Sequence, residues 1–161
     1  MVRPAVSLLL FATLGHAVAQ AADWTRFRGP NGSGVAPKDV PVQASATNNL
    51  LWKVPIPGQG HSSPIILGDK LFLQSAATDG SKRMLLCLDV NTGKVLWIRD
   101  VVGQKAHTHK KNSLASSTPA TDGERVYCLF WVGSAVTLHA YTTEGKPVWA
   151  SSLVSYQSQH G

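Results

Sequence analysis

The chain has 161 residues, a formal net charge of +6, 43% hydrophobic residues and 15% charged residues. This composition is that of a globular protein, and it excludes a disordered or fibrous chain and a long coiled coil. The basic residues are mostly scattered along the sequence, which is typical of a solvated surface and argues against a nucleic-acid partner.

The first 21 residues have the pattern of a secretory signal peptide. Arg3 provides a positive start, the apolar run SLLLFATL follows, and Ala19-Gln20-Ala21 matches the small-x-small rule for cleavage. The alternative is an N-terminal membrane anchor, but the run is shorter than the about 20 residues of a span, and His16 interrupts it. We therefore expect cleavage after Ala21 and a periplasmic or secreted protein that does not span the membrane.

The segment 22–49 is rich in glycine and proline and contains RGPNGSG. That stretch lacks the Gly-Lys-Ser/Thr ending of a phosphate-binding loop and opens no helical pattern. We expect it to be coil that lies over the surface of the domain at 50–161.

Two pairs of similar stretches reveal an internal repeat. SSPIILGDKLFLQSA (62–76) resembles SSTPATDGERVYCLF (116–130), and CLDVNTGKVLW (87–97) resembles HAYTTEGKPVW (139–149). Each unit alternates apolar and polar residues between Gly, Asp and Asn turns, which is the signal for antiparallel hairpins. The predicted strands are 63–67, 70–76, 83–90 and 94–100 in the first unit, and 118–121, 125–132, 136–142 and 146–153 in the second.

A third, partial copy is LLWKVPIPG, Leu50 to Gly58, which resembles one final strand alone. Trp52, Trp97 and Trp149 are then equivalent. Four-stranded units of this length predict an all-β protein built from β-propeller blades, with about two blades, one extra strand and no complete ring. A blade cannot bury both faces alone, so a large residue repeated once per unit predicts a structural wedge between neighbouring blades.

The two cysteines, Cys87 and Cys128, lie in apolar runs of different predicted units. An exported chain meets an oxidising compartment, but two cysteines do not make a disulfide scaffold. We expect two buried free thiols, with a disulfide between them as the less favoured alternative.

The stretch LDVNTGKVLW resembles the tryptophan docking motif of PQQ-type β-propeller repeats, a family that includes quinoprotein dehydrogenases, the outer-membrane assembly factor BamB and many relatives without cofactor. The second copy keeps the Gly-Lys-x-x-Trp part but has Tyr141 where the motif has Asp89. Other stretches, such as WTRFRGPNGSG, are similar to exported members of planctomycete-type bacteria. The residues that carry the repeat motif are Asp89, Thr92, Gly93, Lys94, Trp97, Gly145, Lys146, Trp149 and Trp52.

The resemblance implies a closed ring of seven or eight blades, so we expect the chain to be an N-terminal fragment, with pairing between chains as the alternative. In quinoproteins of this family, the quinone lies over a calcium-type ion, with an Asp base and adjacent cysteines nearby. None of these can be assigned to residues of this chain, so no cofactor is expected, and PQQ would require a complete ring.

The densest polar cluster is QKAHTHKKNS (104–113). His107 and His109 alternate and, with His61, suggest a metal site, but nothing fixes a third ligand and a solvated loop is favoured. Lys105, Lys110 and Lys111 are candidates for an anionic ligand or a glycan. The function that the sequence favours is a non-catalytic binding or scaffold module, with an envelope protein or glycan as partner or self-association through open blade faces. The alternative is part of a PQQ-dependent dehydrogenase, and no catalytic or metal residue is assigned.

Overall fold

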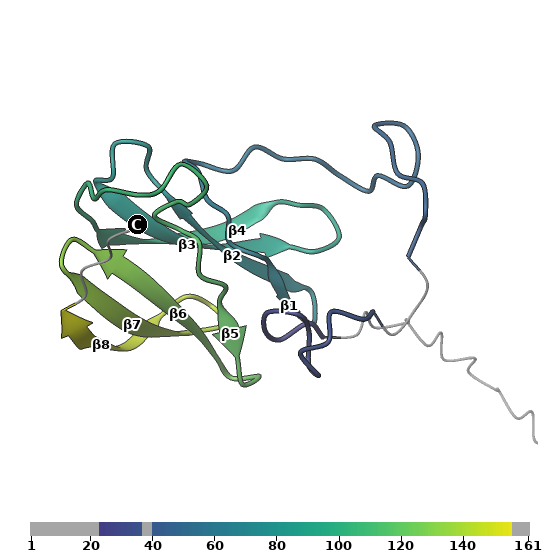
Figure 1. Cartoon of the computed structure of the whole chain (residues 1–161). Helices are drawn as coiled ribbons and strands as arrows, with labels where there is room; N and C mark the ends of the chain where they lie inside the picture. Colours follow the sequence, from purple (N-terminus) through teal and green to yellow (C-terminus); the bar gives the residue numbers. More distant parts are fainter. Residues whose placement is uncertain (1–22, 37–39, 156–161) are drawn as a thin grey trace, which may run out of the picture.

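The computed structural model describes residues 23–36 and 40–155. Within these residues the strands form two four-stranded antiparallel sheets, and consecutive strands are neighbours in each sheet (Figure 1). Each sheet is therefore a meander that one stretch of chain completes before the next sheet begins, as in the blade of a propeller. The predicted all-β class and the two four-stranded units are confirmed, and the two blades do not close a ring.

The predicted strands overlap all eight observed strands. Blade 1 consists of β1 (Ile65–Leu67), β2 (Lys70–Ala76), β3 (Lys82–Asp89) and β4 (Val95–Val102). Blade 2 consists of β5 (Ala120–Thr121), β6 (Arg125–Val132), β7 (Ala135–Thr142) and β8 (Pro147–Ser155). β4 and β8 run two residues past their predicted ends because their last residues still have pairing partners, Lys82 for Val102 and Ala135 for Ser155.

The antiparallel order gives the pair of blades two different ends (Figure 1). The β1–β2, β3–β4, β5–β6 and β7–β8 turns share one end, which we call the turn end. The β2–β3 and β6–β7 turns lie at the opposite end, the loop end, together with residues 103–119, which join β4 to β5. The long connection between the blades is therefore displayed only at the loop end.

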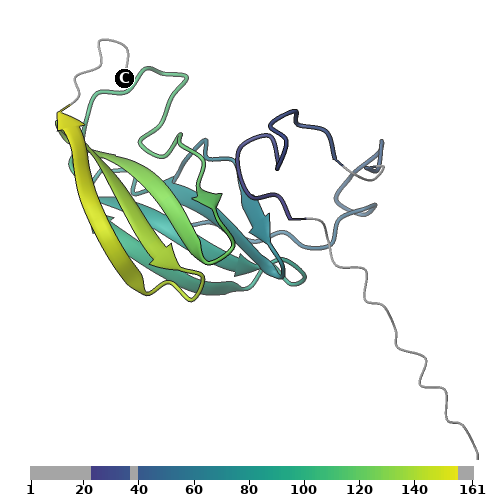
Figure 2. The ribbon, with the colours of Figure 1, turned by 90° about the horizontal axis from the view of Figure 1, so that it is seen from below.

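The blades stack face to face, and the main core lies between them (Figures 1 and 2). In β6 the inward residues Val126, Cys128 and Phe130 recur at period two, as one buried face of a strand requires. Burial of a side chain as large as Phe130 contributes about 2–3 kcal/mol. The buried members of this core are Ile65, Phe72, Leu85, Cys87, Val126, Cys128, Phe130 and Tyr141.

Blade 1 is covered on both faces, and its sequence shows why. The run Met84 to Leu88 is apolar without alternation and is buried throughout, whereas β7 alternates and is buried less continuously. A second buried cluster, Met84, Leu86 and Leu88, lies on the face of β3 that is turned away from blade 2. The segment Leu50 to Gly58 covers that face through Val54 and Ile56.

The prediction of an extra strand at Leu50 to Gly58 is wrong. Its residues alternate between exposed and half-buried as in an extended chain, but they form no strand in the structure. A strand needs a hydrogen-bonded neighbour, and Pro55 and Pro57 have no N–H to donate. The segment packs on blade 1 through its side chains and through the Pro57 carbonyl, which accepts the Ser75 hydroxyl at 2.5 Å. Pairing between main chains begins only at Gln59, which bridges to Ala76.

The described part of the N-terminal segment is coil, as predicted, and lies against the inner strands. Trp24 forms an isolated antiparallel bridge with Ile66, in which its N–H donates to the Ile66 carbonyl at 2.8 Å. Thr121 donates its N–H to the Thr25 carbonyl at 2.9 Å. The segment therefore contacts β1 of blade 1 and β5 of blade 2.

The predicted signal peptide and cleavage site lie outside the described residues. In the described part of the chain, the structure contains no helix long and apolar enough to cross a bilayer. Cys87 and Cys128 are both buried as free thiols.

Alkaline pH is expected to destabilise the core between the blades. Burial raises the pKa of Cys87 and of Tyr141 to about 12, and it also raises the pKa of Cys128. The unfolded chain releases thiol protons from about pH 8.5, whereas the folded chain retains them. The contribution of these groups to the free energy of unfolding is therefore fully present below that pH, and it is lost progressively as the pH rises further.

Urea unfolding between pH 7.5 and 9.5 measures this loss. The double variant C87A/C128A should be less stable at pH 7.5 because it leaves cavities, but its midpoint should change less across the range. An equal pH dependence in both proteins would show that the thiols are not the cause.

Candidate functional site: the blade junction and its loop end

The two blades are joined at the turn end by the ring of Trp97, which packs on the β7–β8 turn. A Cβ added at Gly145 would lie 2.7 Å from this ring, closer than atoms approach in proteins. The Trp97 indole Nε1 donates to the Thr143 carbonyl of the same turn at 3.2 Å. The Arg99 guanidinium lies 5.3 Å from the ring centroid on blade 1 and donates to the Gly145 carbonyl. Trp97 thus combines apolar packing with a directed hydrogen bond across the junction.

Trp52 makes the same type of contact with blade 1. A Cβ at Gly93 would lie 2.6 Å from its ring, and its Nε1 donates to the Val90 carbonyl at 2.7 Å. Although Trp52 does not lie in a strand, its ring occupies the place on the β3–β4 turn that Trp97 occupies on the β7–β8 turn. The packing of a tryptophan ring on a glycine turn is thus repeated at Trp52, although the segment that carries Trp52 forms no strand.

The other motif residues of the first copy build the β3–β4 turn. Asp89 Oδ1 accepts the Thr92 main-chain N–H and the Thr92 hydroxyl, both at 2.8 Å. These hydrogen bonds, with the Thr92 hydroxyl first, lower the pKa of Asp89. The Gly93 N–H donates to the Asp89 carbonyl at 2.8 Å, and the Lys94 N–H donates to the Thr92 hydroxyl at 3.3 Å. The carboxylate is therefore occupied in shaping the turn on which Trp52 packs.

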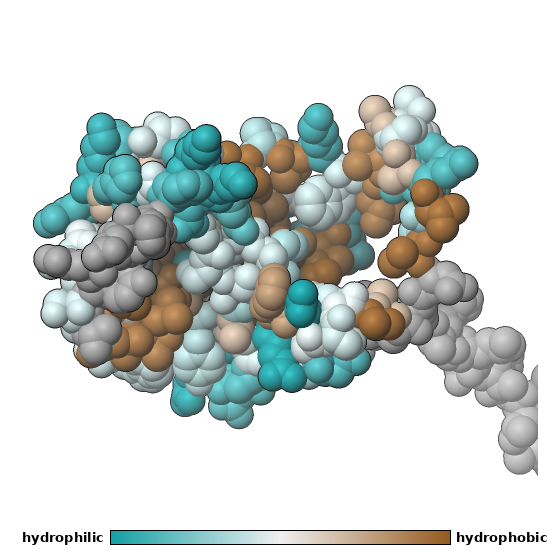
Figure 3. Space-filling model, in the orientation of Figure 1, coloured by the Kyte–Doolittle hydropathy of each residue, from teal (hydrophilic) through white to brown (hydrophobic). Residues whose placement is uncertain are grey.

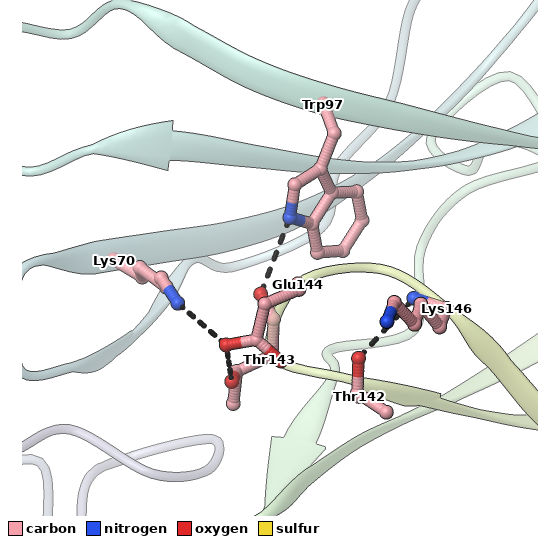
Figure 4. Close-up of polar contacts among 6 residues, drawn as sticks. All are labelled: Lys70, Trp97, Thr142, Thr143, Glu144 and Lys146. Carbon is pink, nitrogen blue, oxygen red and sulfur yellow. Dashed lines mark hydrogen bonds and ion pairs between the residues drawn. The ribbon is translucent and has the colours of Figure 1, made fainter.

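The β7–β8 turn replaces this Asp cap with contacts to blade 1 (Figure 4). Tyr141, at the position of Asp89, is buried in the core between the blades. Glu144 accepts the Thr143 hydroxyl at 2.6 Å and forms an ion pair with Lys70 of blade 1 at 3.1 Å. These two hydrogen bonds lower the pKa of Glu144 to about 2. The Lys146 N–H donates to the Thr142 hydroxyl at 3.2 Å.

Trp149 occupies the corresponding position on blade 2, but its surroundings differ. Its ring lies 6.0 Å from that of Tyr127 and is 43% exposed, and no described glycine turn packs on it. Leu129 is also exposed on this blade, and Figure 3 shows apolar atoms at the surface over blade 2, at the lower left. The face of blade 2 that is turned away from blade 1 is thus an open apolar surface.

Near the loop end, this open surface is hollowed. A cavity of about 220 Å³ lies among Leu129, Trp131, Val136 and Ser117. The indole Nε1 of Trp131 is buried and has no hydrogen-bond partner in the described structure. The equivalent places on blade 1 are filled by the side chains of Gln74 and Arg83, which contact blade 2.

Two buried polar residues of blade 1 cross the junction, and the sequence analysis missed both. Arg83 is 0% exposed and donates to the carbonyls of Trp131 and Gln104, both at 2.9 Å, as well as to the Gly80 carbonyl. Gln74 Nε2 donates to the Leu129 carbonyl at 2.8 Å. The charged residue within the apolar run RMLLCL is the signal that could have identified Arg83.

Arg83 has no carboxylate partner among the described residues, and its burial lowers its pKa. Main-chain carbonyls from both blades and from residues 103–119 satisfy its donors instead. A planar guanidinium suits this task because its donors form a rigid fork. Arg83 therefore fixes the start of the connection at the loop end to the body of both blades.

The histidines suggested as metal ligands do not form a site with a third ligand. The described residues contain no group of three or more His, Cys, Asp or Glu side chains that could hold a metal ion. His107 and His109 are exposed on residues 103–119, and the His61 N–H donates to the Ala115 carbonyl at 3.0 Å.

The described residues also do not match the donor set that PQQ and its cation need. Cys87 and Cys128 are buried in different blades rather than adjacent. The carboxylates of Asp79, Asp89 and Asp122 accept hydrogen bonds within their own turns. These cysteines and carboxylates are thus buried or engaged in turns, and no step of quinone chemistry is assigned to them.

Comparison with known proteins agrees with this architecture. A family model described as outer membrane protein assembly factor BamB matches residues 37–160. The chain therefore belongs to the BamB family of PQQ-like repeat propellers.

The crystal structure of BamB from Moraxella catarrhalis is similar at 23% sequence identity and a TM-score of 0.44, with 63% of this chain covered. The match spans 26% of that solved chain. Comparison with curated proteins gives no match.

Substitution of Gly145 by Ala should loosen the junction. The residue has φ +79°, where a side chain is strained, and its Cβ would overlap Trp97. The strain costs about 1–2 kcal/mol and the overlap about 1–3 kcal/mol more. Gly68→Ala is the matched control, because Gly68 has φ +58° and open space around its Cβ position. Equal losses in the free energy of urea unfolding would contradict the role assigned to the ring.

Substitution of Arg83 by Met should destabilise the protein by about 2–4 kcal/mol, because the carbonyls of Trp131, Gln104 and Gly80 lose a charged donor while the stem volume is kept. Arg83→Lys should also be destabilising, since one ammonium cannot reproduce the fork. Arg28→Met, at an exposed arginine, should change stability by less than about 0.5 kcal/mol. Urea unfolding gives these values, and amide exchange of residues 103–119 should accelerate only in the Arg83 variants. An Arg83→Met cost as small as the control would contradict the assignment.

Proposed function

We propose that this protein is a non-catalytic binding or scaffold module of the cell envelope. The observation that supports this most directly is the way the exposed connection at the loop end is held. Residues 103–119 are mostly polar, and their lysines and histidines are exposed, yet Arg83 ties their beginning to both blades. Loops on a rigid base are a common means of holding partners, because little order is lost when they bind.

The junction contacts support a rigid base. Three contacts span the junction from the turn end to the loop end: the Trp97 ring on Gly145, the Lys70–Glu144 ion pair, and the hydrogen bond from Gln74 to the Leu129 carbonyl. Contacts at several separate points resist hinge motion between the blades better than one contact would. The loop end can therefore present its groups in a constant arrangement.

The proposal includes export through the predicted signal peptide and a periplasmic or secreted location. The family description, an outer membrane assembly factor, is in keeping with a protein or glycan of the envelope as partner. The open apolar face of blade 2, with Trp149, is proposed as a surface for self-association. The similarity to planctomycete-type exported proteins remains a prediction from the N-terminal stretches.

The alternative, part of a PQQ-dependent dehydrogenase, makes opposite predictions in a simple assay. PQQ and calcium are added to this chain and to the longest natural reading frame that contains it. A binding module should leave the absorbance spectrum of PQQ unchanged and should reduce no redox dye when alcohols or glucose are supplied. Circular dichroism before and after addition shows that the protein is folded in the assay. A spectral shift together with dye reduction would overturn the proposed function.

A further inference from the structure

The connection at the loop end has an unusual charge pattern. Residues 103–119, which we call the basic loop, contain three lysines and two histidines but no acidic residue. Lys105, His107 and His109 are exposed, whereas Ala106 and Thr108 between them are half-buried. This alternation is that of an extended chain, in which every second side chain points the same way about 6.6–6.8 Å apart. The basic loop therefore presents a row of hydrogen-bond donors with a regular spacing.

Contacts at both ends hold the basic loop in place. At its start, the Gln104 carbonyl accepts from Arg83, and Gly80 packs so closely on Lys105 that a Cβ there would lie 2.6 Å from the Lys105 Cα. Near its end, the Ala115 carbonyl accepts the His61 N–H. The row of donors is thus carried by the rigid blade pair.

The ring of His109 is also oriented. Its Nδ1 accepts the Lys111 main-chain N–H at 3.2 Å, so in the neutral ring the proton is carried by Nε2. The exposed edge of His109 is then a hydrogen-bond donor. Lys110 and Lys111, both exposed, continue the donors beyond it.

The acidic residues of the blades lie mainly at the other end. Asp69, Asp89, Asp122, Glu124 and Glu144 belong to the four turns of the turn end. At the loop end, Asp100 is paired with Lys82 at 2.8 Å, and Asp79 accepts from Ser81 in its own turn. Neither ion pair of the described residues includes a lysine of the basic loop. Figure 3 shows hydrophilic atoms gathered at this end, at the upper left.

We propose that the basic loop binds an extended acidic segment of a partner protein, with carboxylates at alternate positions facing Lys105, His107 and His109. The inference rests on the proposed function, since it names the partner chemistry of the same loop end. An extended peptide repeats its side chains at the spacing of the basic loop, so several pairs can form in one register. Lys110 and Lys111 then form ion pairs with the next carboxylates of the acidic segment.

The basic loop suits this partner better than a membrane or a compact anion. None of its side chains is a large exposed hydrophobic group that could insert into lipid. Its donors lie in a row, whereas a single phosphate group needs donors that converge on one point. A row of separate donors fits a row of separate carboxylates.

The test uses the full chain and two fluorescent peptides of equal length, composition and charge. In one, Glu and Ser alternate, and in the other they form two blocks. Fluorescence anisotropy at low ionic strength should show that the alternating peptide binds several-fold more tightly. Equal affinities would overturn the register argument, and no binding of either peptide would overturn the proposal. Both results differ from a PQQ-dependent activity, which would instead overturn the proposed function.

Variants locate the site. The triple variant K105S/K110S/K111S should weaken binding of the alternating peptide about tenfold, as expected for the loss of several exposed charge contacts. The control K53S/K94S/K146S removes the same charge from exposed lysines elsewhere and should weaken it less than about twofold. Equal losses would show that only net charge matters. Binding to vesicles of phosphatidylglycerol and phosphatidylcholine that exceeds peptide binding and is lost in the triple variant would assign the basic loop to a membrane and overturn the proposal.

Discussion

The ring of Trp97 can lie on the β7–β8 turn only because residue 145 has no side chain, and the blade pair depends on this fit. A single four-stranded sheet exposes two faces and cannot bury both. When the ring is seated on the glycine turn, its hydrogen bond to the Thr143 carbonyl fixes the distance between the blades. That distance brings Phe72 and Leu85 into one core with Phe130. The same fit of Trp52 on Gly93 covers the other face of blade 1 with a segment that forms no strand.

The strands and turns could be predicted from the sequence because their signals are local. Alternating apolar residues, and glycine at Gly93 and Gly145, report the strand and the turn within a few positions. The contacts across the junction could not be predicted in this way. Gln74 meets the carbonyl of a residue 55 positions away, and such pairs depend on which faces the blades turn to each other. The prediction of a strand at Leu50 to Gly58 failed for a related reason: its pattern is extended, but among the described residues no strand pairs with it.

The candidate site shows the same difference between local signals, which the sequence reports, and contacts between distant residues, which it does not. The composition of the sequence identifies the polar cluster at 104–113, but it does not show which residues hold that cluster in place. Arg83 gives that support, and a lone arginine in an apolar run does not reveal that it bonds to carbonyls on two blades and a connection. The antiparallel order then separates the charges, because acidic turn residues collect at one end and the basic loop at the other. A rigid base and a one-sided display of charge together give the loop end its character.

Arg83 also has a consequence for how two similar units differ in what they need from a neighbour. Blades that share one tryptophan-on-glycine contact could pair with any neighbour that offers the same turn. In blade 2, the places of Arg83 and Gln74 are taken by Val136 and Leu129, as the strand registers show. A buried guanidinium that meets no carbonyl acceptor is strongly unfavourable, so this face of blade 1 needs a neighbour whose main-chain carbonyls reach Arg83 and Gln74. These two polar side chains thus make the covered face of blade 1 chemically different from the corresponding face of blade 2, although both blades carry the same turn motif.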